Sequence, residues 1–385
     1  MHSLYFYLMG LCFALPLPIA SLHLPPHLRF FSHWHCVGIK SQINFAKPLA
    51  VQVGDLPLVL WRDPQNRIYS TINICKHMGS TLDKGKITPT GCLKCPYHGL
   101  EMSKEDSFGT VVEDDGKLFW SYLPETSRPP VVPFAPLPAK KKPVEGSYNP
   151  RTSDYVTSHL VIDMDTSLPD SAYNTMDLRH PEFVHGNMFG FGSGIPPMNL
   201  QHYFYGQGQG NGQGQDNGQS PGQGQCTKPK HNQFGLSFNY KANVLINKIN
   251  QNEGTTHNFH MYVYPTFSWS KVTVDKTKHL LIGVHLLPIG PNKTRWFITI
   301  RHNYYTSNSG QRLMQLLAST ILQQDWIQMR LQSRETELKR AVTFGYTFPE
   351  EDAILRLKDW FRDYKYPAMS TCAELVRFDQ AKSSE

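Results

Sequence analysis

Two short segments that each pair one cysteine with one histidine constrain this sequence more than any other feature. They are Cys75-Lys-His77 and Cys95-Pro-Tyr-His98, and together they form the pattern C-x-H-x17-C-x2-H. We interpret them as two hairpin-like loops that offer one thiolate and one imidazole each. Seven cysteines in 385 residues are too few for a disulfide scaffold. Because three of the seven lie between 75 and 95, the clustering predicts a metal site.

The ligand set favours an iron–sulfur cluster. Two anionic thiolates on one iron and two neutral imidazoles on the other are the ligands of a Rieske [2Fe–2S] centre. A zinc ribbon is the alternative, since cysteine and histidine also suit tetrahedral zinc. Zinc sites usually take cysteine pairs two to four residues apart, so the pattern favours the cluster. Cys92 is interpreted as a spectator thiol, because Cys75, His77, Cys95 and His98 already complete the ligand set.

The segments around these loops predict a small all-β domain over residues 29–135. Runs rich in β-branched and aromatic residues, bounded by Gly, Pro, Asn and Asp, occupy 48–54, 57–61, 67–73 and 117–122. Helical periodicity is absent there. A proline-rich stretch follows, which predicts a linker over 136–152.

The remainder predicts an α+β domain over 153–370, followed by a tail over 371–385. Alternating runs at 257–274, 279–289 and 295–305 indicate an antiparallel sheet. Apolar spacing predicts a helical stretch within 171–185, a long amphipathic helix over 311–340 and another helix from 353 to 361. We expect a curved sheet gripped by the long C-terminal helix.

A glycine- and glutamine-rich segment, 206–225, interrupts two strand-like stretches. Its only apolar side chain is Pro221. Such a composition cannot offset the entropy of ordering, so we expect a disordered surface insertion.

A second candidate metal site lies between 174 and 185. Asn174, Asp177, His180 and His185 form the pattern N-x2-D-x2-H-x4-H. Two histidines five residues apart on a helix-like segment can converge on one metal. With one carboxylate they would form the 2-His-1-carboxylate triad of a mononuclear Fe(II) oxygenase, which leaves positions open for O₂. In a chain with 17 histidines the pair alone is weak evidence.

The carboxylate must come from elsewhere in the chain, and the predicted long helix offers Asp325, Glu335 and Glu337. Asp325 lies one turn after Ile321 and Leu322, which places it near the buried face. A carboxylate there needs a partner, and a metal supplies one. The two glutamates fall in a charged, solvated stretch, so we predict Asp325 as the third ligand.

The segments CKHMGSTLDKG and CPYHGL resemble the Rieske domain of Rieske non-heme iron oxygenases, and D-x2-H-x4-H resembles their iron-binding motif. The resemblance covers residues 28–370 in the same order. It departs at Leu100, a packing position beside the cluster where many members have tryptophan. The resemblance implies a β Rieske domain followed by a helix-grip, START-like catalytic domain. It also implies that His180, His185 and Asp325 hold a mononuclear Fe(2+).

The activity that the resemblance implies is oxygenation. Electrons would come from a ferredoxin or a flavin-dependent reductase, pass through the [2Fe–2S] cluster and reach the mononuclear iron. There O₂ would be activated to hydroxylate or demethylate an apolar, ring-containing substrate. No dinucleotide fingerprint occurs in the sequence, so the reductase is expected to be another chain.

The resemblance also implies a head-to-tail homotrimer in which the cluster of one subunit lies beside the iron of the next. Asp177 would then bond His180 and reach the partner subunit's His98, and a carboxylate there would fix ring orientation. Asn174 corresponds to a polar residue near the iron. The catalytic roles are thus expected at Asp177 and Asn174.

Two other functions are open. One is a Rieske electron carrier with an inert C-terminal domain, which would have no use for Asp177, His180, His185 and Asp325. The other is a membrane-bound scaffold with a vestigial cluster, and the intact cysteine and histidine ligands argue against it. A net charge of +7 without a long Lys/Arg run gives no reason to expect nucleic-acid binding.

The first 28 residues contain no Asp, Glu, Lys or Arg. Residues 4–22 are apolar or small and come close to the ~20 residues that span a bilayer. A membrane anchor, an uncleaved signal and a cleaved leader are all open, although Pro16 and Pro18 would break the last turn of a helix. We expect membrane association through this segment, with an organelle or the cytoplasm as the other locations. An anchor would favour a lipophilic substrate such as a sterol or pigment.

Overall fold

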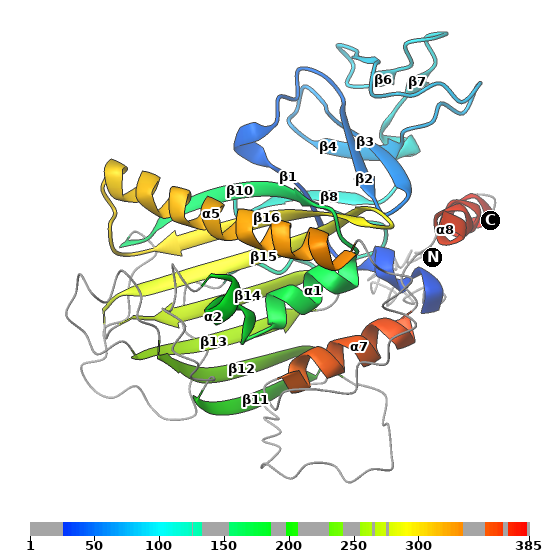
Figure 1. Ribbon diagram of the computed structural model, residues 1–385. Coiled ribbons are helices and arrows are strands. Elements are labelled where there is room, and N and C mark those ends of the chain that lie inside the picture. The colour runs from blue at the N-terminus through cyan, green and yellow to red at the C-terminus, as the bar shows by residue number, and fades with distance from the viewer. Residues whose placement is uncertain are drawn as a thin grey trace, which may run out of the picture.

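A small β region and a seven-stranded antiparallel sheet make up the fold (Figure 1). The computed structural model describes residues 26–124, 126–132, 154–185, 198–206, 231–241, 255–263, 266–274, 277–333, 351–364 and 369–382.

The small β region consists of three short antiparallel sheets, with the orders β1-β9-β8, β2-β3-β4 and β5-β6-β7. Its elements are η1 (Pro26–Ser32), β1 (His35–Ile39), η2 (Lys40–Gln42), β2 (Leu49–Val53), β3 (Leu56–Arg62), β4 (Ile68–Ile72), β5 (Lys86–Ile87), β6 (Leu93–Lys94), β7 (Glu101–Met102), η3 (Lys104–Asp106), β8 (Thr110–Asp114) and β9 (Lys117–Ser121). Each β-branched or aromatic run noted in the sequence corresponds to one of these strands.

The large sheet has the order β10-β16-β15-β14-β13-β12-β11, so β11 to β16 form a meander and β10 pairs with its last strand. Its strands are β10 (Val156–Met164), β11 (Met198–Gly206), β12 (His231–Lys241), β13 (Thr255–Val263), β14 (Phe267–Thr273), β15 (His279–Gly290) and β16 (Lys293–His302). The helices are α1 (Leu168–Met176), α2 (His180–Val184), α5 (Asn308–Ser333), α7 (Asp352–Tyr364) and α8 (Met369–Lys382).

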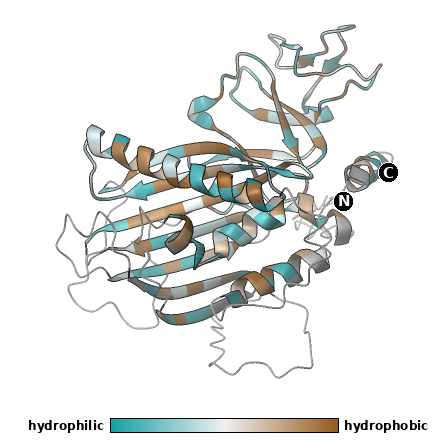
Figure 2. Ribbon diagram, viewed as in Figure 1, coloured by the Kyte–Doolittle hydropathy of each residue, from teal (hydrophilic) through white to brown (hydrophobic). Residues whose placement is uncertain are grey.

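The helices α1, α2 and α5 lie on one face of the large sheet (Figure 1). Apolar and polar residues alternate along its strands and around α5 (Figure 2), as expected for elements with one buried face. An all-β region followed by an antiparallel sheet with a long helix confirms the predicted α+β fold class.

Two elements differ from the sequence prediction. The stretch 171–185 forms two helices rather than one, because the Asp177 carboxylate accepts the backbone N–H groups of Arg179 and His180 and starts α2 anew. The end of the chain, expected to be a tail from 371, forms α8. The buried side chains Cys372 and Leu375 hold α8 against the core.

Several predicted segments fall wholly or mainly outside the described residues. These are the leader or anchor over 1–28, the linker over 136–152, the insertion over 206–225 and the last residues of the helix predicted over 311–340. Within the described ranges, no helix combines the length and the apolar character needed to cross a membrane.

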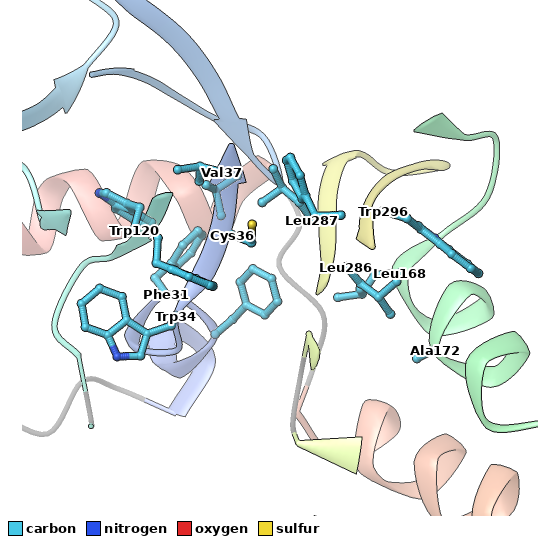
Figure 3. Packing of buried hydrophobic residues seen from close by; sticks show 14 of the residues in the cluster. Phe31, Trp34, Cys36, Val37, Trp120, Leu168, Ala172, Leu286, Leu287 and Trp296 are labelled. Atoms are coloured by element: carbon cyan, nitrogen blue, oxygen red, sulfur yellow. The ribbon is translucent and has the colours of Figure 1, made fainter. Parts of the chain in front are cut away.

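One hydrophobic core joins the two β regions. It includes Phe31, Cys36 and Trp120 from the small region and Leu287 and Trp296 from the large sheet. Figure 3 shows Leu287 between Cys36 of the small region and the group of Leu286, Leu168 and Trp296. β1 packs on β15 and β16. The shared core fixes the large sheet against the small β region.

A buried charged group also spans the boundary. Lys117 of β9 is fully buried, and its Nζ lies 2.6 Å from Asp115 Oδ2. Arg301 of β16 pairs with the other carboxylate oxygen of Asp115 and donates from Nη1 to the Val132 carbonyl at 2.8 Å. Removing one member of a buried ion group leaves the others without a counter-charge.

Replacing Asp115 with asparagine should therefore lower the free energy of unfolding by about 3 kcal/mol. Asn tolerates the left-handed backbone at this position (φ 51°), so backbone strain does not contribute. Urea unfolding of the purified protein measures the change. Glu113 is the control, because it pairs with Lys40 and Arg62 at the surface and Glu113→Gln should cost less than about 1 kcal/mol. Equal losses in the two variants would contradict a structural role for the buried group.

Candidate metal centres

The two cysteine–histidine loops have the same backbone hydrogen bonds. In the first, Cys75 N–H donates to the Ser80 carbonyl, and Gly79 N–H donates back to the Cys75 carbonyl. In the second, Cys95 pairs with Leu100 in the same way, and Gly99 N–H donates to the Cys95 carbonyl. Both glycines have φ near +75° (75° and 77°), which favours glycine. The sequence therefore builds two matching loops that face each other.

The loops place their thiols and imidazoles in different environments. Cys75 and Cys95 are buried in a small apolar cluster that includes Trp61. His77 and His98 are exposed, and their ring centroids lie 4.8 Å apart. An inner thiolate pair and an outer imidazole pair match the two irons of a Rieske cluster.

Local hydrogen bonds favour the thiolate form of Cys95. Burial disfavours its charged form, but the backbone N–H groups of Tyr97 and His98 point at the sulfur and lower the pKa of the Cys95 thiol. Cys92 lies outside both loops, where its backbone pairs with Thr88. The structure thus brings together the four predicted cluster ligands and leaves Cys92 apart.

The surface around the exposed imidazoles is apolar. Met78 and Tyr97 are 66% and 64% exposed, and Ile74 and Leu100 are also exposed. Leu100 is 41% exposed, so its side chain lies at the loop surface with these residues, and its predicted packing beside the cluster stays a prediction.

The second centre consists of His180, His185 and Asp325. The short helix α2 starts at His180 and ends just before His185, so both rings project from its ends toward α5. On α5, Asp325 and Met329 are buried one turn apart. The candidate ligand atoms all lie within 4.8 Å of one another. The structure thus assembles the three residues that the sequence predicted as iron ligands.

The rings present the same nitrogen to the carboxylate. Asp325 Oδ1 lies 3.4 Å from His180 Nε2 and 3.1 Å from His185 Nε2. The other nitrogens have partners, since His180 Nδ1 lies 2.8 Å from the Asp177 carbonyl and His185 Nδ1 lies 2.8 Å from Gln324 Oε1. Both acceptors require an Nδ1–H donor, so the Nε2 lone pairs are directed into the centre. Such partners fix the tautomer of metal-binding histidines.

The charges of this centre suit a cation. Burial opposes ionisation of Asp325, but the two adjacent histidine rings outweigh it and lower the pKa of that carboxyl to about 2. Burial opposes protonation of His180, but Asp325 outweighs it and raises the pKa of that imidazole. Asp325 Oδ1 is buried without a hydrogen bond of good geometry. Two imidazoles and one carboxylate with this geometry fit Fe(II).

A cavity of about 300 Å³ adjoins the second centre. His180, His185 and Asp325 line one side together with neighbouring residues of the α1–α2 segment and of α5, and residues of β12 to β16 line the other. This volume is at the lower end for small-molecule sites. Its wall is mainly apolar, with a few polar side chains, so it suits an apolar ligand with few polar groups.

Asp177 and Asn174 both line this cavity. The implied bond between the Asp177 carboxylate and the His180 ring is absent, because Oδ2 lies 4.0 Å from His180 Nδ1. The main-chain carbonyl of Asp177 holds the ring instead, while Oδ1 accepts the backbone N–H groups of Arg179 (2.9 Å) and His180 (3.1 Å). These two contacts occupy Oδ1 within one chain.

Gln324 was not among the predicted site residues. Its signal in the sequence is its position directly before Asp325, but only the structure shows that its amide oxygen meets His185. His260 and Ser270, which also line the cavity, were missed as well. They lie on strands whose facing direction depends on the sheet register.

Comparison with known proteins identifies the first centre. A family model for the Rieske [2Fe-2S] domain matches residues 33–115. This range contains Cys75, His77, Cys95 and His98. Residues 33–115 are therefore a Rieske [2Fe–2S] domain.

Two of the sequence relatives are named as oxygenase components. The 3-ketosteroid-9-alpha-monooxygenase oxygenase component of Rhodococcus rhodochrous is 25% identical over 177 residues, which cover 42% of this chain and 45% of that protein. The dicamba O-demethylase oxygenase component of Stenotrophomonas maltophilia is 27% identical over 172 residues, which cover 40% of this chain and 46% of that protein. The chain thus spans less than half the length of these relatives.

Among solved structures, dicamba monooxygenase bound to dicamba has a similar fold, with a TM-score of 0.61 at 16% identity over 87% of this chain and 97% of that one. Fold and site together define a Rieske domain joined to an antiparallel sheet with a His–His–Asp centre. Residues 33–115 thus belong to the Rieske domain family, and the chain is similar in sequence and fold to the oxygenase components named above.

Proposed function

We propose that this protein is the terminal oxygenase of a multicomponent system and hydroxylates or demethylates an apolar, ring-containing substrate with O₂. The observation that carries the proposal is the His180–His185–Asp325 group beside an apolar cavity. An electron carrier needs neither a second metal centre nor a substrate cavity. Two relatives, a ketosteroid monooxygenase and a dicamba demethylase, are named for the same chemistry, which supports the proposal.

In this proposal Cys75, His77, Cys95 and His98 hold a [2Fe–2S] cluster, and His180, His185 and Asp325 hold a mononuclear Fe(2+). When bound, the two groups supply one-electron transfer and the reduction of O₂. Gln324 and the Asp177 carbonyl keep both Nε2 atoms directed inward. The apolar cavity wall orients the substrate and excludes bulk water.

We further propose a head-to-tail homotrimer. In Figure 1 the loops around β6 and β7 lie far from α2, so one chain does not bring its two centres together. The apolar surface of Ile74, Met78, Tyr97 and Leu100 around the cluster histidines suits a partner subunit. A head-to-tail trimer would place the partner subunit's His98 near Asp177, as the family resemblance implies.

The electron donor in the proposal is a separate ferredoxin or flavin-dependent reductase. The relatives are named as oxygenase components, which supports a separate donor. Membrane association through residues 4–22, with organellar and cytoplasmic locations as alternatives, also stays a proposal.

The test of this function is an assay of iron and acid-labile sulfide in the purified protein. The proposal requires about three iron atoms and two sulfides per chain if both sites are filled. Two iron atoms with two sulfides, even after anaerobic Fe(II) addition, would instead support the electron carrier. Substrate-dependent O₂ consumption with a chemical reductant then tests the oxygenase activity.

A further inference from the structure

The cavity beside His180, His185 and Asp325 has one polar wall and one apolar wall. The strand pairing carries rows of side chains across β13, β14, β15 and β16 on the cavity face. One row runs from His260 through Ser270 to Ile282. A second runs from Ser268 through Val284 to Ile298. In both rows the polar residues lie on β13 and β14, and the aliphatic residues lie on β15 and β16.

His260 is the most unusual member of the polar wall. It is buried, and its Nδ1 lies 2.8 Å from Ser270 Oγ on the neighbouring strand. Its other nitrogen, Nε2, is buried without a hydrogen-bond partner among the described residues. Buried polar atoms are nearly always paired in proteins, and leaving one unpaired is costly. Because His260 lines the cavity, a ligand in the cavity can supply the partner.

Ser268 repeats the same feature two residues from Ser270 along β14. Its side chain is 1% exposed, lines the cavity, and has an Oγ atom without a partner among the described residues. His260 and Ser268 thus each bring a polar atom without a partner among the described residues to the lining of one cavity.

The wall carries no fixed positive charge. Burial lowers the pKa of His260 to about 4, so the ring is neutral near pH 7. None of the described residues that line the cavity is lysine or arginine. A carboxylate beside His260 would lose its hydration without gaining a counter-charge from a lysine or arginine of the described lining.

We infer that His260, oriented by Ser270, donates to or accepts from one uncharged oxygen of the substrate, a carbonyl or a hydroxyl, while the rest of the substrate is an apolar ring system packed on β15 and β16. This inference rests on the proposed oxygenase function and names its substrate class. The tautomer decides between the two oxygens. If Ser270 donates to Nδ1, Nε2–H is a donor that suits a carbonyl. If Nδ1–H donates to Ser270 Oγ instead, Nε2 is an acceptor that suits a hydroxyl.

The test compares four probes with one ring system: tetralin, 2-tetralone, 2-tetralol and tetralin-2-carboxylate. Equilibrium dialysis against the holoprotein, without an electron donor, gives their dissociation constants. One hydrogen bond should make the ketone or the alcohol bind about fivefold more tightly than tetralin. The carboxylate should bind most weakly. Tighter binding of the ketone would indicate the Nε2–H tautomer of His260, and tighter binding of the alcohol would indicate the Nδ1–H tautomer.

His260→Phe should abolish this preference, which is measured against tetralin binding in the same variant. His260→Gln, which keeps a polar group near Nε2, should retain part of it. Ser270→Ala should reduce the preference, again measured against tetralin in the same variant, and a purely structural role would not change this ratio. The matched control is His257→Phe, because His257 lies on the same strand but is exposed and bonded to Asn239. Iron and sulfide contents equal to those of the wild type show that a variant is folded. If His260→Phe loses metal, the test relies on His260→Gln and Ser270→Ala instead.

The inference is overturned if wild type binds all uncharged probes equally, binds the carboxylate best or binds none of them. It is also overturned if a folded His260→Phe variant keeps the preference. Turnover is scored separately, with a chemical reductant and O₂. A ketone or alcohol preference without O₂ consumption would refute the oxygenase proposal alone, whereas turnover without the preference would refute only the role of His260.

Discussion

Replacing Asp325 with asparagine should remove the mononuclear iron and leave the Rieske cluster intact. The substitution takes the only carboxylate from the His180–His185–Asp325 group, and the remaining amide is a poor ligand for Fe(II). We expect iron affinity to fall by more than the ~10–100-fold typical of residues that only support a ligand. Turnover should fall with it. Metal analysis and the visible spectrum of the cluster measure the two sites separately.

Two neighbours of Asp325 provide graded controls. Gln324→Ala removes the acceptor that holds His185 Nδ1 and should weaken iron binding by about 10–100-fold. Gln323→Ala changes an exposed residue on the same helix and should have no effect. Full iron content and turnover in Asp325→Asn would show that this group is not the iron site.

Replacing Asp177 with asparagine should separate electron transfer from iron binding. The asparagine Oδ1 can still accept the backbone N–H groups of Arg179 and His180, so α2 keeps its start and the main-chain carbonyl keeps its contact with the His180 ring. Only the negative charge is lost. If that charge meets the partner subunit's His98, single-turnover product formation should fall by at least ~10–100-fold with both metals in place.

Stopped-flow reoxidation of the reduced cluster, with O₂ and substrate present, measures this step. Asp170→Asn is the matched control, because Asp170 is an exposed carboxylate near the start of α1 and bonds only locally to Ser167. Asp177→Ala removes the cap as well and should also destabilise the segment by about 1 kcal/mol. Unchanged reoxidation in Asp177→Asn would leave Asp177 as a helix cap without a role between subunits.

The sequence was sufficient for the cluster loops and for many of the longer strands and helices. Each loop holds its cysteine and histidine within four residues, and its shape depends on local hydrogen bonds and one glycine. Strand runs such as 67–73 and 279–289 were recognisable because side-chain alternation has a period of two. Local sequence patterns did not predict α8, because its burial depends on contacts with η1 and the core.

Only the tertiary structure decided how distant residues meet. The sequence could favour Asp325, but the 3.1 Å approach to His185 depends on how α5 lies on the sheet, across 140 positions of chain. It could name Asp177, yet the capping of α2 determined that the carbonyl, not the carboxylate, holds His180. Which side of β13 faces the cavity was undetermined until the register was known, because a shift of one residue would turn His260 away and His257 inward. Local patterns determine loops and strands because their hydrogen bonds close within a few residues, whereas a site built from several elements depends on the packing that places them together.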